Sequence, residues 1–221
     1  MIAKNLDQEK WDFLDEELLA GSIRGAFGHA GIYRGKTSEK RRRELGAELR
    51  RLLRECATAY KSDVSDEIHN KNIRKLADKL SQDFKDVMKD ERFRIGVAQK
   101  ALNLYLKYLW CMGRIDIPPH CPFDSEVLRE AKISGSWTSL DDMEGYKLWV
   151  EKARSVAAGT NSTLSEWELR FWNEKIPRTR EPSFHLHKWK SKSGASMNPN
   201  GNVESATDKT ITKSRTRFIR G

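Results

Sequence analysis

The stretch that decides the fold is Gly96–Met112, GVAQKALNLYLKYLWCM, because it is apolar around most of the circumference of a helix. Its large apolar side chains are Leu102, Leu104, Tyr105, Leu106, Tyr108, Leu109 and Trp110. A helix of this kind belongs in the middle of a core, so other helices must surround it. One polar stripe interrupts the apolar surface, since Lys100, Asn103 and Lys107 fall within about 60° of one another.

Apolar residues at helical spacing predict further helices on both sides of this stretch. Upstream they cover Gln8–Ala20, Ser38–Tyr60 and Asn72–Met88, and downstream they cover Asp124–Ala131, Leu140–Ala158 and Leu164–Lys175. Thr163 and Glu166 fit a capping box for the last helix. The segment 21–36 contains five glycines, which predicts a loop. Strand-like alternation is scarce, so we expect an all-α fold.

Positive charge is concentrated at one end of the chain. The 221 residues carry a formal net charge of +9. The last 47 residues contain eleven Lys and Arg and three acids, so they account for +8 of it. We therefore expect a helical domain over residues 1–176 and a basic, largely irregular tail over 177–221. A basic tail favours a polyanionic partner, most plausibly nucleic acid, although a tail that only aids solubility is the alternative.

Several classes of protein are excluded by composition. No apolar run approaches the roughly 20 residues of a membrane span, and residues 1–10 lack the apolar core of a secretory signal. Cys56, Cys111 and Cys121 are too few for a disulfide framework or for a cluster held by four thiolates. We expect a cytoplasmic, monomeric protein that makes no membrane contact and holds no metal or cofactor.

Two residues stand out for their chemistry. Lys100 lies near the start of the central helix, where the helix dipole and partial burial would both lower its pKa and favour a nucleophilic amine. The alternative is that its ammonium extends to solvent from the edge of the core. Asp124 follows a rigid Pro122-Phe123 and precedes a helix, which is typical of an N-cap. Backbone N–H groups would keep such a carboxylate ionised, so capping and chemistry are compatible.

Two segments resemble the helix-hairpin-helix DNA glycosylase superfamily. Residues 96–101, GVAQKA, match the family's Gly-Val-Gly hairpin with a lysine two residues later, and residues 122–128, PFDSEVL, match its Val-Asp-Thr-His-Val type segment. The chain departs from the family at Ala98, which replaces the second hairpin glycine, and at Glu126, which replaces the histidine. Lys100 and Asp124 are also 24 positions apart, a longer separation than in many members.

The resemblance implies a helical enzyme that flips a damaged or modified base out of double-stranded DNA and excises it, leaving an abasic site. Asp124 would stabilise positive charge on the sugar, and Lys100 would attack its C1′ atom if the enzyme also has AP-lyase activity. Damaged purines are the family's common substrates, and a hypermodified phage base, with a role in defence, is another option. The cysteines that bind an iron–sulfur cluster in some members are absent, so no cofactor is implied.

The resemblance also implies how DNA would be held. The DNA-contacting residues would be Gly96, Ala98, Gln99, Arg94, Arg34 and Lys36. The base pocket would draw on Phe27, Tyr33, Asn103, Trp110 and His120, with Trp137 as a further aromatic wall. The main alternative is a non-catalytic helical DNA-binding module. The others are a metal site using His120, Cys121 and Cys111, and a scaffold for other proteins.

Overall fold

The computed structural model describes residues 5–175, and over this range the protein is all-α, as the sequence predicts. An isolated bridge between Tyr33 and Met88 is the only β pairing within it. The α-helices are α1 (Leu6–Phe27), α2 (Glu39–Ala57), α3 (Asp66–Phe84), α4 (Ile95–Cys111), α5 (Ser125–Glu130), α6 (Met143–Ala158) and α7 (Leu164–Lys175). Two 3₁₀-helices are η1 (Thr58–Lys61) and η2 (Lys89–Glu91). The predicted basic tail lies outside the described residues.

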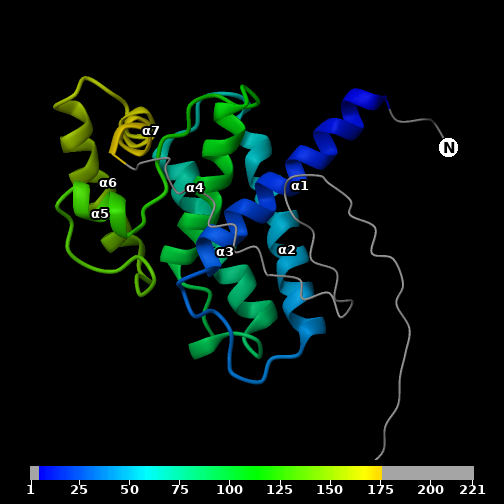
Figure 1. Ribbon diagram of the computed structural model, residues 1–221. Coiled ribbons are helices and arrows are strands. Elements are labelled where there is room, and N and C mark those ends of the chain that lie inside the picture. Colours follow the sequence, from blue (N-terminus) through cyan, green and yellow to red (C-terminus); the bar gives the residue numbers. More distant parts are fainter. Residues whose placement is uncertain (1–4, 176–221) are drawn as a thin grey trace, which may run out of the picture. The chain divides into compact units, whose positions relative to one another are not determined.

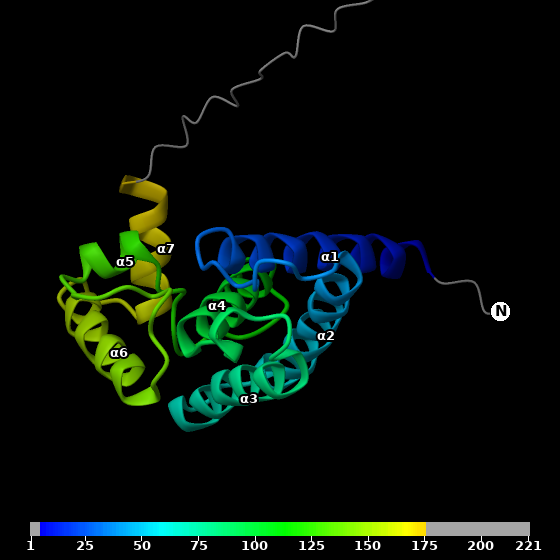
Figure 2. The same cartoon turned by 90° about the horizontal axis from the view of Figure 1, so that it is seen from below.

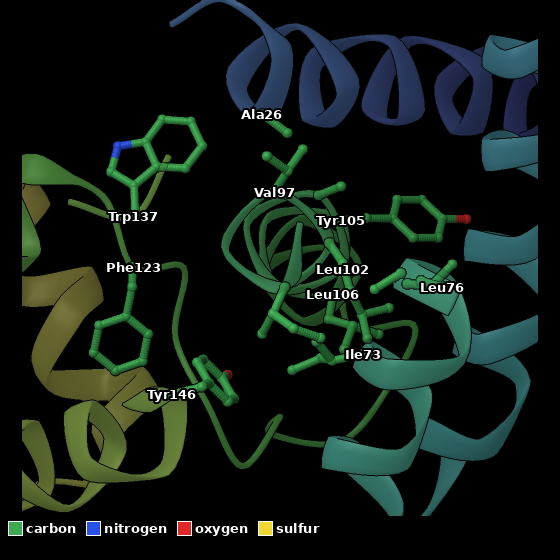
Figure 3. Close-up of a cluster of buried hydrophobic side chains, with 14 of the residues drawn as sticks. Ala26, Ile73, Leu76, Val97, Leu102, Tyr105, Leu106, Phe123, Trp137 and Tyr146 are labelled. Atoms are coloured by element: carbon green, nitrogen blue, oxygen red, sulfur yellow. The ribbon is translucent and has the colours of Figure 1, made fainter. Parts of the chain in front are cut away.

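Helix α4 lies at the centre, with α1, α2 and α3 around one side and α5, α6 and α7 together on the other (Figures 1 and 2). Its apolar side chains fill the space between the helices: Val97 points toward Ala26 of α1, and Leu102 and Leu106 point toward α3 (Figure 3). Twelve of its seventeen residues are buried. This confirms the central position that the sequence predicts for the stretch.

The prediction of a glycine-rich loop from residue 21 is wrong for its first seven residues, because α1 continues to Phe27. Two glycines of this helix face α4: a Cβ atom on Gly21 would lie 3.5 Å from the Tyr108 ring, and one on Gly25 would lie 2.7 Å from Leu104. Close packing of two helices thus outweighs the low helix propensity of glycine. Although α1 is 22 residues long, no helix within residues 5–175 is long and apolar enough to cross a membrane.

Capping residues set the other helix boundaries. Helix α3 begins at Asp66 rather than Asn72, since the Ser65 hydroxyl accepts a hydrogen bond from the Ile68 backbone N–H. Helix α6 begins at Met143 rather than Leu140, with Asp142 as its N-cap. The predicted capping box at the start of α7 is present, because Glu166 accepts the Thr163 N–H at 2.9 Å.

Candidate functional site

The structure brings together the two residues for which the sequence suggests chemistry. Lys100, in the second turn of α4, places its Nζ atom 2.6 Å from Oδ2 of Asp124, which precedes α5. The two side chains are 9 % and 15 % exposed, so the pair lies at the edge of the core rather than inside it. The alternative of a lysine that extends freely to solvent does not describe this side chain.

The Asp124 carboxylate is held at both oxygens. Its Oδ1 accepts the backbone N–H groups of Glu126 at 3.0 Å and Val127 at 2.9 Å, so the residue is the N-cap of α5, as predicted. Its Oδ2 accepts the ammonium of Lys100. A carboxylate fixed in this way has little freedom to reorient, which suits a group that must stabilise charge at a defined point.

Trp137 forms a wall beside the pair. Lys100 Nζ lies 5.7 Å from the centre of the Trp137 ring, within the range of a cation–π contact. Trp137 and Phe123 are both buried and lie on the α5–α7 side of α4 (Figure 3). The site therefore combines an amine, a carboxylate and an aromatic ring contributed by three separate segments.

The predicted polar stripe of α4 faces the α5–α7 half of the protein along its whole length. Asn103 donates to the carbonyl of Cys121 at 2.9 Å and to the Tyr146 hydroxyl at 3.1 Å. One turn later, Lys107 pairs with Glu168 of α7 at 2.7 Å, and this carboxylate is only 1 % exposed. Lys100, Asn103 and Lys107 therefore form a polar seam that joins the two sides of the fold.

Gln99 positions Asp124 rather than lying on the surface. Its side-chain amide donates to the Phe123 carbonyl at 2.8 Å, and its oxygen accepts the Phe123 N–H at 3.1 Å. This two-way contact fastens the residue before Asp124 to α4. Gln99 is completely buried, so its side chain cannot make the DNA contact suggested by the sequence.

The start of α4 does not offer its backbone to a phosphate. The Gly96 N–H donates to the Leu140 carbonyl at 2.8 Å, and the Ile95 N–H donates to the Asp141 carboxylate at 3.1 Å. Gly96 and Ala98 are both buried. Because the segment 137–141 occupies this helix end, the phosphate contacts predicted there do not fit the structure.

The three cations proposed as DNA contacts differ in their surroundings. Arg94 pairs with Asp90 and also donates to the Thr138 carbonyl at 3.2 Å. Arg34 pairs with Glu91 at 3.1 Å, with both side chains more than half exposed. Lys36 is exposed on the loop before α2. Arg94 is therefore committed to the protein, whereas Arg34 and Lys36 remain on the surface.

The residues proposed for the base pocket do not converge on one place. Phe27 and Tyr33 contact each other, with ring centres 6.0 Å apart, and line a surface cavity beside α2. Asn103 and His120 instead share the Tyr146 hydroxyl in the interior. Trp110 is half-buried near the end of α4. A single pocket built from all five is therefore wrong, and Trp137 is the aromatic residue that borders Lys100.

A polar cluster that the sequence does not reveal surrounds two buried histidines, His69 and His120, and adjoins the seam through the Tyr146 hydroxyl. The centres of the His69 and His120 rings are 4.3 Å apart. The Tyr60 hydroxyl lies 2.8 Å from His69 Nδ1, and Asp66 Oδ1 lies 3.2 Å from His120 Nε2. Arg154 of α6 holds the same Asp66 at 2.6 Å. Only the tertiary fold brings these residues together, because Asp66 and Arg154 are 88 positions apart. Within residues 5–175, no three His, Cys, Asp or Glu side chains are arranged to hold a metal ion.

Acid should destabilise the protein through this cluster. Burial holds the pKa of His69 well below 6.5 and also lowers the pKa of His120, while the Arg154 hydrogen bond keeps the pKa of Asp66 far below its usual value. Both histidines are thus neutral in the folded state but take up protons when unfolded below about pH 6.5, so stability falls as the pH drops through that range. Asp66 extends the loss to more acidic pH.

Urea unfolding measured from about pH 7.5 to about pH 5 tests this expectation. His69→Gln should flatten the dependence, whereas His29→Gln, at an exposed position, should leave it unchanged. Equal stability of the wild-type protein at both ends of the range would contradict it.

Comparison of the chain with protein-family models, with curated protein sequences and with solved structures finds no match. No residue role is therefore transferred from a relative. The roles of Lys100 and Asp124 are inferred from their contacts with each other and with Trp137.

Proposed function

We infer that the protein is a DNA glycosylase, which flips a damaged or modified base out of double-stranded DNA and excises it to leave an abasic site. The observation that supports this most is the 2.6 Å contact between Lys100 and Asp124 at the edge of the core, beside Trp137. The pattern that resembles the helix-hairpin-helix glycosylases gives both residues a role in the reaction, and 24 positions separate them in the chain.

The proposed chemistry starts with the carboxylate. Cleavage of an N-glycosidic bond builds positive charge on the sugar, and Asp124, fixed by two backbone N–H groups, stabilises that charge. The base departs with the electrons of the C1′–N bond and takes up a proton. A water molecule then attacks C1′ and gives up a proton to a nearby proton acceptor, and the product is an abasic site.

Lys100 supplies a second route. If its ammonium first gives a proton to Asp124 or to water, the free Nζ can form the bond to C1′ as the bond to the base breaks. The C1′–O4′ bond of the sugar ring then breaks, O4′ takes up a proton to become a hydroxyl, and the electron pair on Nζ forms the C1′=N bond of a Schiff base, which is the intermediate of AP-lyase activity. The substrate within this proposal is a damaged purine or a hypermodified phage base, and the latter would place the enzyme in defence.

Base release measures this function directly. Duplexes carrying uracil, oxidised purines, alkylated purines, or native or glucosylated hydroxymethylcytosine are assayed for free base and alkali-labile strand breaks. Asp124→Asn should lower release by about a hundredfold or more, because it removes the charge that stabilises the transition state. Borohydride should trap the wild-type protein on DNA if the lysine attacks, and Lys100→Ala should abolish trapping.

Glu168→Gln is the matched control, because it also removes a carboxylate from a lysine on the polar seam. It should retain release when both variants are assayed below their unfolding temperatures. Equal release by Asp124→Asn and the wild-type protein would refute the assignment.

A non-catalytic DNA-binding module is the second candidate. It is favoured by the similarity of the two ion pairs on the seam, since Lys107–Glu168 joins α4 to α7 just as Lys100–Asp124 joins α4 to α5. Both pairs would then be structural. Salt-sensitive binding to duplex DNA without release from any substrate would support this candidate.

A further inference from the structure

A second site lies away from Lys100, where the end of α1 meets the start of α2. It is a surface cavity of about 370 Å³. Its lining comprises Ile23, Phe27, Tyr33, Glu39, Arg42, Arg43, Gly46 and Arg50. Three guanidinium groups face a single carboxylate, and the apolar wall is provided by α1. A cavity of this composition attracts an anion that carries an apolar or aromatic portion.

The arginines of α2 fall into two groups. Those outside the cavity are closely paired: Arg41 with Asp86 at 2.7 Å, Arg51 with Glu48 at 2.7 Å, and Arg54 with Asp15 at 2.6 Å. Arg42 and Arg43, which line the cavity, have no carboxylate within 4.0 Å among residues 5–175. The lack of partners is therefore confined to the arginines that face the cavity.

Arg42 is held in place without its donors being used. Its guanidinium carbon lies 4.6 Å from the centre of the Tyr33 ring, so a cation–π contact fixes its plane. Its Nε is buried, and no hydrogen-bond acceptor for it lies in the described part of the chain. Arg50, the third arginine, bonds to the Gly46 carbonyl at 3.1 Å and approaches Glu16 only to 3.6 Å. Arg42 and Arg50 are therefore preorganised, which lowers the entropy lost when a ligand binds.

We propose that this cavity binds a phosphate group carried by a nucleotide, with Arg42 and Arg43 contacting its oxygens and Phe27 and Ile23 contacting the sugar or base. A planar guanidinium with unused donors matches the oxygens of a phosphate. The phosphate belongs either to the backbone of a bound strand or to a free nucleotide. The site goes beyond the proposed glycosylase reaction, and its occupancy does not require base release.

Binding by the full chain tests the site. The probes are a short unmodified DNA duplex, followed by fluorescence anisotropy at several salt concentrations, and adenosine monophosphate and inorganic phosphate, followed by calorimetry. Arg43→Gln and the double variant Arg42→Gln/Arg43→Gln should bind at least one probe about tenfold more weakly than the wild-type protein. For the duplex, the dependence of log affinity on log salt should also become shallower by about one for each lost contact.

Arg51→Gln is the matched control, because it removes the same charge from the same helix at a residue already paired with Glu48 and Glu55. It should bind as the wild-type protein does. Arg43 is exposed, so its substitution should not affect folding, which circular dichroism verifies.

The probes separate the two sources of phosphate. If the arginine variants lose affinity for the duplex alone, the bound phosphate is that of the strand backbone. If they lose affinity for adenosine monophosphate, the ligand is a free nucleotide. The proposal is overturned if the wild-type protein binds none of the probes, or if Arg43→Gln and Arg51→Gln bind them equally. Binding of adenosine monophosphate and of inorganic phosphate is measured without any base release, so a failure of the glycosylase proposal leaves this result distinct.

Discussion

Replacing Gly96 with alanine is expected to lower the free energy of unfolding by about 3 kcal/mol, because overpacking against backbone cannot be relieved by a change of rotamer. The new Cβ atom would lie 1.7 Å from the Trp137 carbonyl oxygen and 2.8 Å from the carbonyl carbon. The segment 137–141 would have to move away, with loss of the hydrogen bond from Gly96 to Leu140. Chemical denaturation monitored by circular dichroism measures the change.

Gly25→Ala is the matched substitution, because Gly25 also lies in a helix at a close contact. Its Cβ would lie 2.7 Å from Leu104 Cδ2, the end of a flexible side chain that can turn aside. The gain in helix propensity, about 1 kcal/mol, opposes the residual crowding. Similar unfolding midpoints for the two variants would show that segment 137–141 does not pack against α4 as closely as described.

Removing Lys107 is expected to destabilise the protein by about 3–5 kcal/mol at neutral pH, because it leaves the buried Glu168 without a counter-charge. Burial raises the pKa of Glu168 even while Lys107 opposes the shift. A raised carboxyl pKa means that the folded state holds its proton more tightly than the unfolded state, so stability falls as the pH rises through that range. The loss of unfolding free energy in Lys107→Ala, relative to the wild-type protein, should therefore become smaller when the pH is lowered and Glu168 becomes neutral.

Thermal and urea unfolding of Lys107→Ala, at about pH 8 and about pH 5, tests both parts of this expectation. The double variant Lys107→Met/Glu168→Gln should recover most of the loss, since it leaves no buried charge. Lys147→Ala is the control, because its pair with Glu144 is exposed on both sides and should contribute less than about 1 kcal/mol. Equal losses for Lys107→Ala and Lys147→Ala would contradict the assignment of Glu168 as a buried charge.

The sequence predicts well those features that depend on local periodicity. The central position of α4, its polar stripe and the N-cap role of Asp124 follow from residues close together in the chain. The extension of α1 through Gly21 and Gly25 could not be predicted in this way, because its stability comes from contact with Tyr108 and Leu104 of another helix. Local propensity and tertiary packing disagree there, and packing decides the outcome.

The sequence points to the two main residues of the candidate site, Lys100 and Asp124, but not to the contacts that surround them. Lys100 and Asp124 each stand out in the sequence, and the fold places their side chains 2.6 Å apart, a contact that no local pattern predicts. The burial of Gln99 and the blocking of the α4 end by Leu140 depend on a distant segment, so no local pattern reports them. The cluster around His69 and His120 is equally non-local, since its members come from η1, α3, α6 and the connection before α5.

The two sides of α4 are held by different kinds of contact, which water can replace to different extents. Toward α1 and α3 the helix is held mainly by hydrocarbon contacts, such as Val97 against Ala26 (Figure 3), together with one hydrogen bond from the Tyr105 hydroxyl to Asp15 of α1. Toward α5–α7 it is held through Lys100, Asn103 and Lys107, whose partners water can replace one by one. We therefore expect the α5–α7 side to open more readily than the α1–α3 side, and such opening would expose the Lys100–Asp124 pair to water.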